Sequence, residues 1–256
     1  MMLRAVSFVG FKGSGKTSAI VNVAKVLREQ GYVVATIKHM PEHDLDFKGT
    51  DTYKQKSIVH YVIAVGKRHT ALIVDNPDSL TDVLRMIPKA DFVLIEGFKK
   101  ERICPRVLCV KRLEEIPYLL SGLEIAITGP IATQDILRRE VEARYGLKVV
   151  NSLTEPEVLA SIIKEKAFLL PGLNCGKCGY DCSTLAELIV RGERNVESCQ
   201  FLRASLVELT INGTPLELNE FLQKFLYNML VGALSTLKGF HEGEITIRIR
   251  APPKGG

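Results

Sequence analysis

Residues 10–17 read Gly-Phe-Lys-Gly-Ser-Gly-Lys-Thr, and this stretch decides the fold. An apolar run at residues 3–9 precedes it and a helical pattern at residues 17–30 follows it, which predicts a strand, a tight loop and a helix in that order. The spacing is that of the P-loop, G-x-x-x-x-G-K-[ST], whose glycines let successive backbone N–H groups face phosphates. The stretch therefore predicts a site for a nucleoside triphosphate with Mg²⁺ at the start of a helix.

Three side chains have specific expected roles at this site. Lys16 is placed to reach the β- and γ-phosphates, and the hydroxyl of Thr17 is placed to bind Mg²⁺. The apolar strand expected at residues 92–96 ends in Glu96, as Walker B strands do, so this carboxylate is expected to bind Mg²⁺ through water or to orient the attacking water. The predicted nucleotide-binding residues of the loop are Gly10, Lys12, Gly13, Ser14, Gly15, Lys16, Thr17 and Ser18.

A polar segment at residues 38–54 follows the second expected strand, where a P-loop protein places its switch-like loop. Asp46 and Asp51 of this segment are further candidate Mg²⁺ ligands. The candidate catalytic residues are Glu96, Asp51 and Lys16. The sequence has no Asn-Lys-x-Asp or Thr-Lys-x-Asp element to read guanine, so these residues by themselves leave GTP and ATP open.

Strands and helices alternate through the first 165 residues, which predicts an α/β fold of the P-loop NTPase type with a mostly parallel sheet and helices on both faces. A hairpin expected at residues 61–74 suggests that this sheet is mixed. The expected strands are residues 3–9, 33–38, 61–65, 70–74, 92–96, 106–110, 124–128 and 148–151, and the expected helices are residues 17–30, 80–87, 135–145 and 155–166.

Three parts are expected along the chain: a nucleotide-binding domain at residues 1–167, a four-cysteine module at residues 168–203 and an α+β tail at residues 204–256. The tail is expected to hold a hairpin at residues 206–218, a helix at residues 219–237 and a strand at residues 245–250. This helix has an apolar stripe wider than one face needs. Burial on a small sheet and a dimer or partner interface both remain open for it.

Composition excludes several classes of protein. The chain has 256 residues, 46% of them apolar, so a sizeable core is expected and disorder is not. A net charge of +5 is too small to argue for nucleic acid. No apolar stretch reaches the roughly 18 residues that suggest a membrane span, and the first residues do not resemble a signal peptide. The expected location is therefore the cytoplasm.

Four features in order make the first 165 residues resemble the MobB family of molybdopterin-guanine dinucleotide biosynthesis adapter proteins. The first is the P-loop at residues 10–17, and the second is Thr-Ile-Lys-His at residues 36–39. The third is Asp-x-x-Gly-x-Asp-Thr-Tyr-Lys at residues 46–54. The fourth is Leu-Ile-Glu-Gly-Phe-Lys at residues 94–99, followed by Pro-Arg at residues 105–106.

This resemblance implies GTP as the nucleotide, with weak GTP hydrolysis at most, and it adds Lys38 and His39 to the expected nucleotide-binding residues. It also implies a homodimer. The implied role is support for the attachment of GMP to molybdopterin by a MobA-like nucleotidyltransferase, with molybdopterin or its guanine dinucleotide form as a further partner.

Four cysteines lie within 25 residues, at Cys175, Cys178, Cys182 and Cys199, and such a cluster in a cytosolic protein indicates metal rather than disulfides. The segment from residue 170 is similar to the small four-iron, four-sulfur domain of electron-transfer and corrinoid iron–sulfur proteins. Four thiolates are sufficient to hold a cubane cluster, and Gly176 and Gly179 are expected to leave backbone N–H groups for its sulfurs.

The cysteine spacing departs from that domain in one place. Three residues separate Cys178 from Cys182, where the similar domain has four. A closed structural zinc site and thiols without metal therefore remain alternatives to the 4Fe-4S cluster. Cys104 and Cys109 lie on or near a strand and are interpreted as small buried residues.

Overall fold

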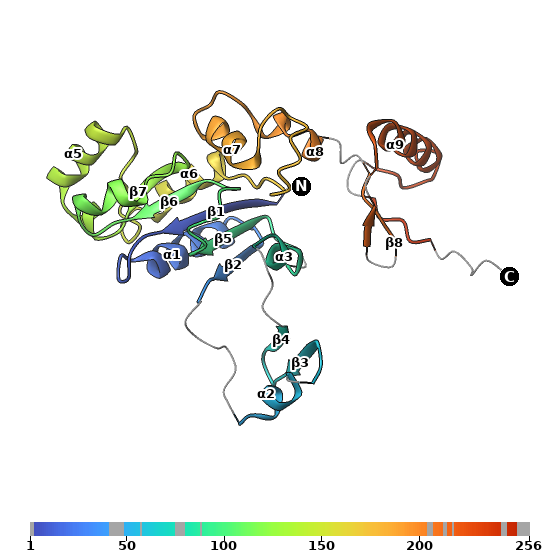
Figure 1. Cartoon of the computed structure of the whole chain (residues 1–256), viewed down its shortest axis with the longest axis horizontal. Coiled ribbons are helices and arrows are strands. Elements are labelled where there is room, and N and C mark those ends of the chain that lie inside the picture. The colour runs from blue at the N-terminus through green and yellow to red at the C-terminus, as the bar shows by residue number, and fades with distance from the viewer. Residues whose placement is uncertain are drawn as a thin grey trace. The chain divides into compact units, whose positions relative to one another are not determined.

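The computed structural model describes residues 3–40, 49–56, 58–74, 80–87, 89–203, 207–211, 214–216, 218–241 and 245–249. Two compact units, Met1–Cys199 and Gln200–Gly256, make up the chain (Figure 1). Each unit is described by itself. The three-part division, with a boundary between the nucleotide-binding domain and the cysteine module, remains a prediction.

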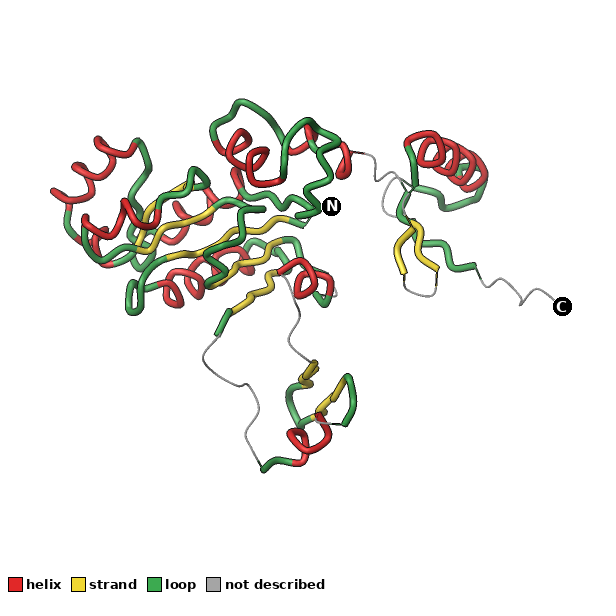
Figure 2. Tube along the Cα trace, viewed as in Figure 1, coloured by secondary structure: helices red, strands yellow, loops and turns green. Residues whose placement is uncertain are grey.

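A five-stranded sheet in the order β2-β5-β1-β6-β7 forms the centre of the first unit, and all of its described pairings are parallel (Figure 2). Its strands are β1 (Arg4–Val9), β2 (Val34–Lys38), β5 (Phe92–Glu96), β6 (Arg106–Cys109) and β7 (Glu124–Thr128). In this register Ser7 lies between Ile95 and Arg106, so the carboxyl ends of β1, β5 and β6 meet at one edge. The predicted α/β class is confirmed.

Alternate residues of the strands enter two separate apolar clusters, as expected for a sheet covered on both faces. One cluster joins Phe8, Leu94 and Val107 to helices α1 (Lys16–Glu29) and α6 (Pro156–Lys166). The other joins Val9 and Leu108 to α4 (Ile116–Leu119), η2 (Pro130–Thr133) and α5 (Asp135–Tyr145). These helices fix the ends of the strands, where the candidate site lies.

The expected hairpin exists, but the prediction that it makes the main sheet mixed is wrong. Among the strands that the structure describes, β3 (Tyr61–Val65) and β4 (Thr70–Val74) pair with each other and with no strand of the main sheet, and α2 (Asp51–Lys56) precedes them. Within the described residues, Tyr61, Ile63, Val65 and Leu72 expose between 53% and 79% of their surface. The hairpin therefore presents an apolar face of its own.

Further short elements complete the first unit. They are α3 (Leu80–Arg85), η1 (Leu113–Glu115), α7 (Cys182–Val190) and η3 (Val196–Ser198). The prediction of a strand at residues 148–151 is wrong, because the described residues form only a single bridge there, between Ile127 and Val149. The chain turns at once toward α6, where the backbone oxygen of Asn151 accepts bonds from the N–H groups of Thr154 and Glu155.

The second unit contains α8 (Gln200–Arg203), strands β8 (Leu209–Ile211) and β9 (Thr214–Leu216), and helix α9 (Glu220–Leu234). Asn219 caps α9, as expected, by accepting a bond from the N–H of Leu222. Gln223 is buried, whereas Phe221 and Phe225 are 72% and 53% exposed, so the wide apolar stripe is not buried on the hairpin. The interface alternative remains a prediction. The strand expected at residues 245–250 is absent from the described residues 245–249.

Among the described residues, no helix is long and apolar enough to cross a membrane.

Candidate functional site

The P-loop joins the carboxyl end of β1 to the amino end of α1, and its backbone is arranged for an anion. Gly13 and Gly15 have φ values of 74° and 84°, which are left-handed conformations that glycine adopts without strain. Gly15 is the N-cap of α1, and no side chain caps the helix there. The first N–H groups of α1 are therefore left for a ligand, and the positive end of the helix dipole faces the same place.

Two close backbone approaches hold this loop in shape. A Cβ on Gly10 would lie 2.2 Å from the backbone oxygen of Cys109 in β6. A Cβ on Gly129, which follows β7 and has a φ of 105°, would lie 2.7 Å from the backbone oxygens of Ser14 and Val110. Neither position has space for a side chain. Gly129 was missed from the sequence, although a glycine directly after an apolar strand was an available signal.

The polar side chains of the site make contacts with the backbone of the loop and with one another. The ammonium of Lys16 donates to the backbone oxygens of Phe11 at 2.9 Å and Gly10 at 3.3 Å. The hydroxyl of Thr17 donates to Glu96 Oε2 at 2.9 Å. Lys38 Nζ lies 3.9 Å from the same oxygen. The structure therefore brings together Lys16 and Thr17 of α1, Lys38 of β2 and Glu96 of β5.

The donor set fits a triphosphate with Mg²⁺. The hydroxyl of Ser14 is buried beneath the loop and has no hydrogen-bond partner among the described residues, so the loop contains an unsatisfied polar atom. The Thr17 hydroxyl and the Glu96 carboxylate provide adjacent oxygen ligands, which is the chemistry that Mg²⁺ prefers. Lys12 and Ser18 are exposed, and Lys111 Nζ braces the loop by donating to the backbone oxygen of Lys12 at 2.8 Å.

The remaining predicted residues of the site lie in different surroundings. The ring of His39 stacks on Phe98, with 4.4 Å between the ring centroids, and the backbone N–H of His39 donates to the backbone oxygen of Glu96. Asp51 begins α2, and its carboxylate is 91% exposed and pairs with Lys54. Within the described residues, Asp51 makes no hydrogen bond or ion pair with the P-loop or Glu96. Asp46 lies outside the described residues.

Arg106 fixes the segment that follows Glu96, and sequence reasoning missed this role. It is buried at the start of β6, and its Nη2 donates to the backbone oxygens of Lys99 and Glu101, both at 2.7 Å. Burial lowers the pKa of this guanidinium, and the neighbouring carboxylate of Glu124 opposes that shift. A charged residue inside an apolar strand was the signal that could have identified it.

The cysteine segment places its four thiols in different environments. Cys175 is exposed, Cys178 is half-buried, and Cys182 and Cys199 are buried. Cys182 is the first residue of α7, and its N–H donates to the side-chain oxygen of Asn174 at 2.9 Å. Asp181 caps the helix through the N–H of Thr184 at 2.7 Å, and this bond lowers the pKa of its carboxyl.

The arrangement of this segment does not yet form a metal centre. Among the described residues, no three His, Cys, Asp or Glu side chains are grouped closely enough to hold a metal ion. The N–H of Gly179 donates to the backbone oxygen of Gly176 at 2.9 Å, so the expectation that it is available to a cluster sulfur is wrong here. The donor chemistry fits a cluster, but the geometry does not, so assignment of the four thiolates remains a prediction.

The other two cysteines are buried in the sheet region, as predicted. Cys104 and Cys109 are 1% and 0% exposed. Burial raises the pKa of each thiol to about 12. Both remain protonated near neutral pH and have no nucleophilic role.

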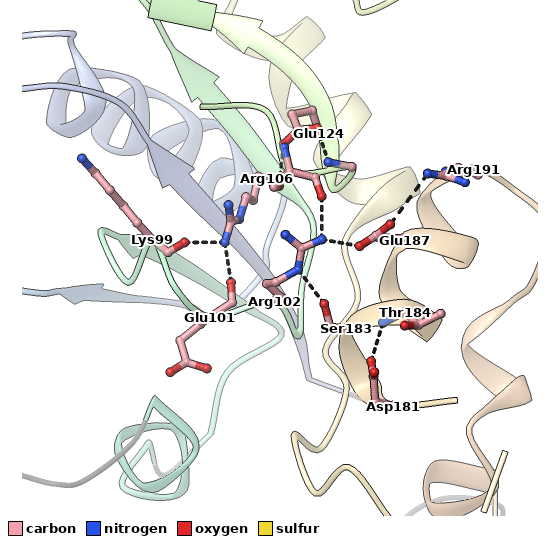
Figure 3. Close-up of polar contacts among 12 residues, drawn as sticks. Lys99, Glu101, Arg102, Arg106, Glu124, Asp181, Ser183, Thr184, Glu187 and Arg191 are labelled. Atoms are coloured by element: carbon pink, nitrogen blue, oxygen red, sulfur yellow. Dashed lines mark hydrogen bonds and ion pairs between the residues drawn. The ribbon is translucent and has the colours of Figure 1, made fainter. Parts of the chain in front are cut away.

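Arg102 joins the cysteine segment to the segment after Glu96 (Figure 3). Its Nε donates to Ser183 Oγ at 2.5 Å, and its Nη2 donates to the backbone oxygen of Ser121 at 2.6 Å and to the Glu187 carboxylate. Ser183 and Glu187 both belong to α7. Arg102 lies in a run of charged residues that resembles a solvated surface, so no sequence signal distinguished it.

Two family models match separate parts of the chain. The model described as "Molybdopterin guanine dinucleotide synthesis protein B", or MobB, matches residues 5–126. The model described as "Putative Fe-S cluster" matches residues 170–201, which include all four clustered cysteines.

Similar proteins agree with the first of these matches. A "Probable molybdopterin-guanine dinucleotide biosynthesis adapter protein" of Bacillus subtilis is 32% identical over 137 residues, which are 48% of this chain and 73% of that protein. A "Putative molybdopterin-guanine dinucleotide biosynthesis adapter protein" of Methanocaldococcus jannaschii is 28% identical over 242 residues, 93% of each chain. The crystal structure of Bacillus subtilis MobB, 24% identical, superposes with a TM-score of 0.52 over 64% of this chain and 98% of that one, which supports the fold alone.

Proposed function

The chain belongs to the MobB family of molybdopterin-guanine dinucleotide biosynthesis adapters, and we propose that it binds GTP with Mg²⁺ and supports the attachment of GMP to molybdopterin. In this proposal its direct partners are GTP, molybdopterin or its guanine dinucleotide form, and a MobA-like nucleotidyltransferase. Hydrolysis of GTP is weak at most.

One observation carries the nucleotide part of the proposal. The backbone of the P-loop is arranged for an anion, and Gly10 and Gly129 approach the neighbouring backbone too closely to leave space for a side chain. The N–H groups at the start of α1 have no side-chain cap. A backbone site of this kind selects phosphate groups and does not read the base, so GTP is preferred over ATP here on family membership.

The side chains take the following roles. Lys16 exchanges its bonds to the backbone oxygens of Phe11 and Gly10 for bonds to phosphate oxygens. Thr17 and Glu96 exchange their mutual hydrogen bond for contacts to Mg²⁺ or its water. Lys38, 3.9 Å from Glu96, then holds the carboxylate in place. The metal neutralises phosphate charge when it is bound.

The homodimer is also a proposal, and the β3–β4 hairpin supports it. Tyr61, Ile63 and Val65 alternate along β3 and face solvent together, with Leu72 opposite Ile63 in the register. A two-stranded sheet is marginal in water without a partner for its apolar face. A second copy of the chain is the partner proposed for this face.

Lys16→Ala tests the nucleotide site, with Lys25→Ala on the exposed side of α1 as the matched control. Calorimetric titration with Mg-GTP and with Mg-ATP should show binding in the wild type and the control, and a loss of about 100-fold or more in Lys16→Ala, since bonds to ionised groups are strong. Unchanged GTP affinity in Lys16→Ala would overturn the site. Tighter ATP than GTP binding would overturn the choice of nucleotide.

A second function, a nucleotide-gated iron–sulfur redox or metal-delivery protein, is favoured by a different observation. Arg102 ties the segment after Glu96 directly to α7, whose first residue is Cys182. An adapter has no evident need for such a tie, whereas a gated cluster does. Protein purified without oxygen should be brown and contain iron and sulfide in this case. Colourless protein with one zinc would eliminate electron transfer.

A further inference from the structure

Residues 97–103 contact the nucleotide site with their first half and the cysteine segment with their second half. Lys99 Nζ lies 5.2 Å from the ring centroid of Phe11 in the P-loop, and Phe98 stacks on His39 at the end of β2. Four residues after Phe98, Arg102 contacts α7. One short segment thus connects two sites that the family models treat separately.

The contacts at the nucleotide end are of a kind that a nucleotide must exchange. Thr17 and Glu96 bond to each other, and Lys16 bonds to the backbone of Phe11. The oxygens and the ammonium of these groups are the ones expected on Mg²⁺ and phosphate, so binding has to break both contacts. Glu96 is the last residue of β5, and the connecting segment begins at the next residue.

The connecting segment has little freedom to absorb such a change. Phe98 has a φ of 49°, an uncommon conformation for a bulky residue, and its stacking on His39 holds it there. A Cβ on Gly97 would meet that of His39 at 3.0 Å. Arg106 binds the backbone oxygens of Lys99 and Glu101. A shift at Glu96 is therefore passed along the segment instead of being lost within it.

At the other end, Arg102 is the only residue of residues 97–103 for which the described hydrogen bonds and ion pairs reach α7. Its guanidinium bonds to Ser183, one residue after Cys182, and to Glu187 one turn further along the helix (Figure 3). A planar fork held by two helix side chains and the backbone oxygen of Ser121 fixes orientation as well as distance.

A cavity of about 440 Å³ lies at this junction, with Lys100, Arg102, Cys182 and Ser183 in its wall. Of the charged residues in its wall, Arg85 pairs with Asp82, and Arg102 pairs with Glu187 of α7. The cavity gives α7 room to move when residues 97–103 move. Cys182, 8% exposed, lines the cavity, so access to its thiol depends on the position of this wall.

We propose that Arg102 couples the nucleotide site to the cysteine segment, so that bound nucleotide changes the packing and accessibility of α7 and Cys182. This inference rests on the proposed binding of nucleotide at the P-loop. It adds the residue through which the two sites influence each other, and it holds whether the cysteines carry a cluster, zinc or no metal.

Hydrogen–deuterium exchange of full-length protein, purified without oxygen, tests the coupling. Saturating Mg-GTP should change the exchange of peptides covering residues 181–191 by about fivefold or more, the low end of measured coupling between sites. Arg102→Ala should abolish that change while calorimetry shows that GTP still binds. Arg191→Ala should preserve it, because Arg191 is the C-cap of α7 and its described ion pair, with Glu187 at 3.7 Å, stays within the cysteine segment.

The outcomes separate the proposals. No GTP binding by the wild type would refute the proposed nucleotide site. Binding without an exchange response in α7, or a response that persists in Arg102→Ala, would refute the coupling alone. Glu187→Gln keeps the shape of the helix partner and removes its charge, so it should reduce the response even if Arg102→Ala folds poorly, and a full response in that variant would contradict the proposal.

Discussion

The P-loop is the predicted nucleotide site and the cysteine segment is the predicted metal site, yet they differ in what holds them in shape. The P-loop is fixed by backbone packing: Gly10 lies against Cys109, and Gly129 lies against Ser14. In the cysteine segment Gly172 approaches the side chain of Thr81, but a Cβ on Gly176 or Gly179, next to the cysteines, would meet nothing within 4 Å. Protein packing therefore fixes the first site, and a metal is proposed to fix the geometry of the second.

The difference has a physical origin in the ligands. A phosphate site needs N–H groups that point one way, and a strand, a turn and a helix N-terminus supply them without help. A four-thiolate site needs four soft anions within a few ångströms, and their repulsion is relieved only by the metal that they bind. In this segment Cys182 and Cys199 are buried, whereas Cys175 is exposed.

Gly129→Ala is the change that should have the largest effect, because it breaks the packing of the better-built site. The new Cβ would lie 2.7–2.9 Å from three backbone atoms in a conformation with a φ of 105°. The free energy of unfolding should fall by about 3 kcal/mol, within the range of severe single substitutions. GTP affinity should fall by about tenfold or more as the backbone of Ser14 is displaced, which calorimetry measures.

Gly31→Ala is the matched control for this variant. Gly31 has a φ of 87°, but a Cβ there would meet nothing within 4 Å. Only conformational strain remains, about 1 kcal/mol, with no change in nucleotide affinity. If both variants had equal effects, the P-loop would not depend on the approach of Gly129, and the contrast between the two sites would fail.

The same contrast explains what the sequence could predict. The P-loop motif, the α/β class and the site residues Lys16, Thr17 and Glu96 follow from local order along the chain, since Lys16 and Thr17 begin the helix after β1 and Glu96 ends β5. The roles of Arg102, Arg106 and Gly129 depend on which segments the fold brings together, so the sequence signals at Arg106 and Gly129 mark the positions but not their partners. The prediction of a mixed sheet was wrong for a related reason. Periodicity indicated the strands β3 and β4, but not that, among the described strands, they pair with each other and not with the main sheet.

Removal of metal should affect the cysteine segment more than the P-loop. Treatment of the anaerobically purified protein with a strong chelator should speed hydrogen–deuterium exchange in peptides covering residues 174–199 by about tenfold or more, because metal binding and local folding are linked there. Without nucleotide, peptides covering the P-loop and α1 should exchange at their original rates. Equal acceleration in both regions would show that the P-loop also depends on the metal, and no change in either would show that residues 174–199 are held by protein contacts alone.

Cys104→Ala tests whether the buried thiol of Cys104 stays protonated in the folded protein. Burial raises the pKa of this thiol to about 12, whereas in the unfolded chain it ionises near pH 8.5. As pH rises from neutral to 10, the unfolded state loses the proton and the folded state keeps it, so the free energy of unfolding falls. Urea titrations at pH 7 and pH 10 should show a decrease about 2 kcal/mol smaller in Cys104→Ala than in the wild type. An equal decrease in both proteins would mean that the Cys104 thiol ionises in the folded state.

Substitution of Asn174 should have the smallest effect. This residue holds the backbone of the cysteine segment in place at one point. It has a φ of 47°, and its side-chain oxygen accepts the N–H of Cys182. Asn174→Gly removes the strain along with the hydrogen bond, whereas Asn174→Ala removes only the bond. The alanine variant should therefore be less stable than the glycine variant by about 1 kcal/mol or less, measured by urea unfolding, and both should retain bound metal. Loss of metal from Asn174→Ala equal to that from Cys182→Ser would show that this segment, like the P-loop, is built by its backbone.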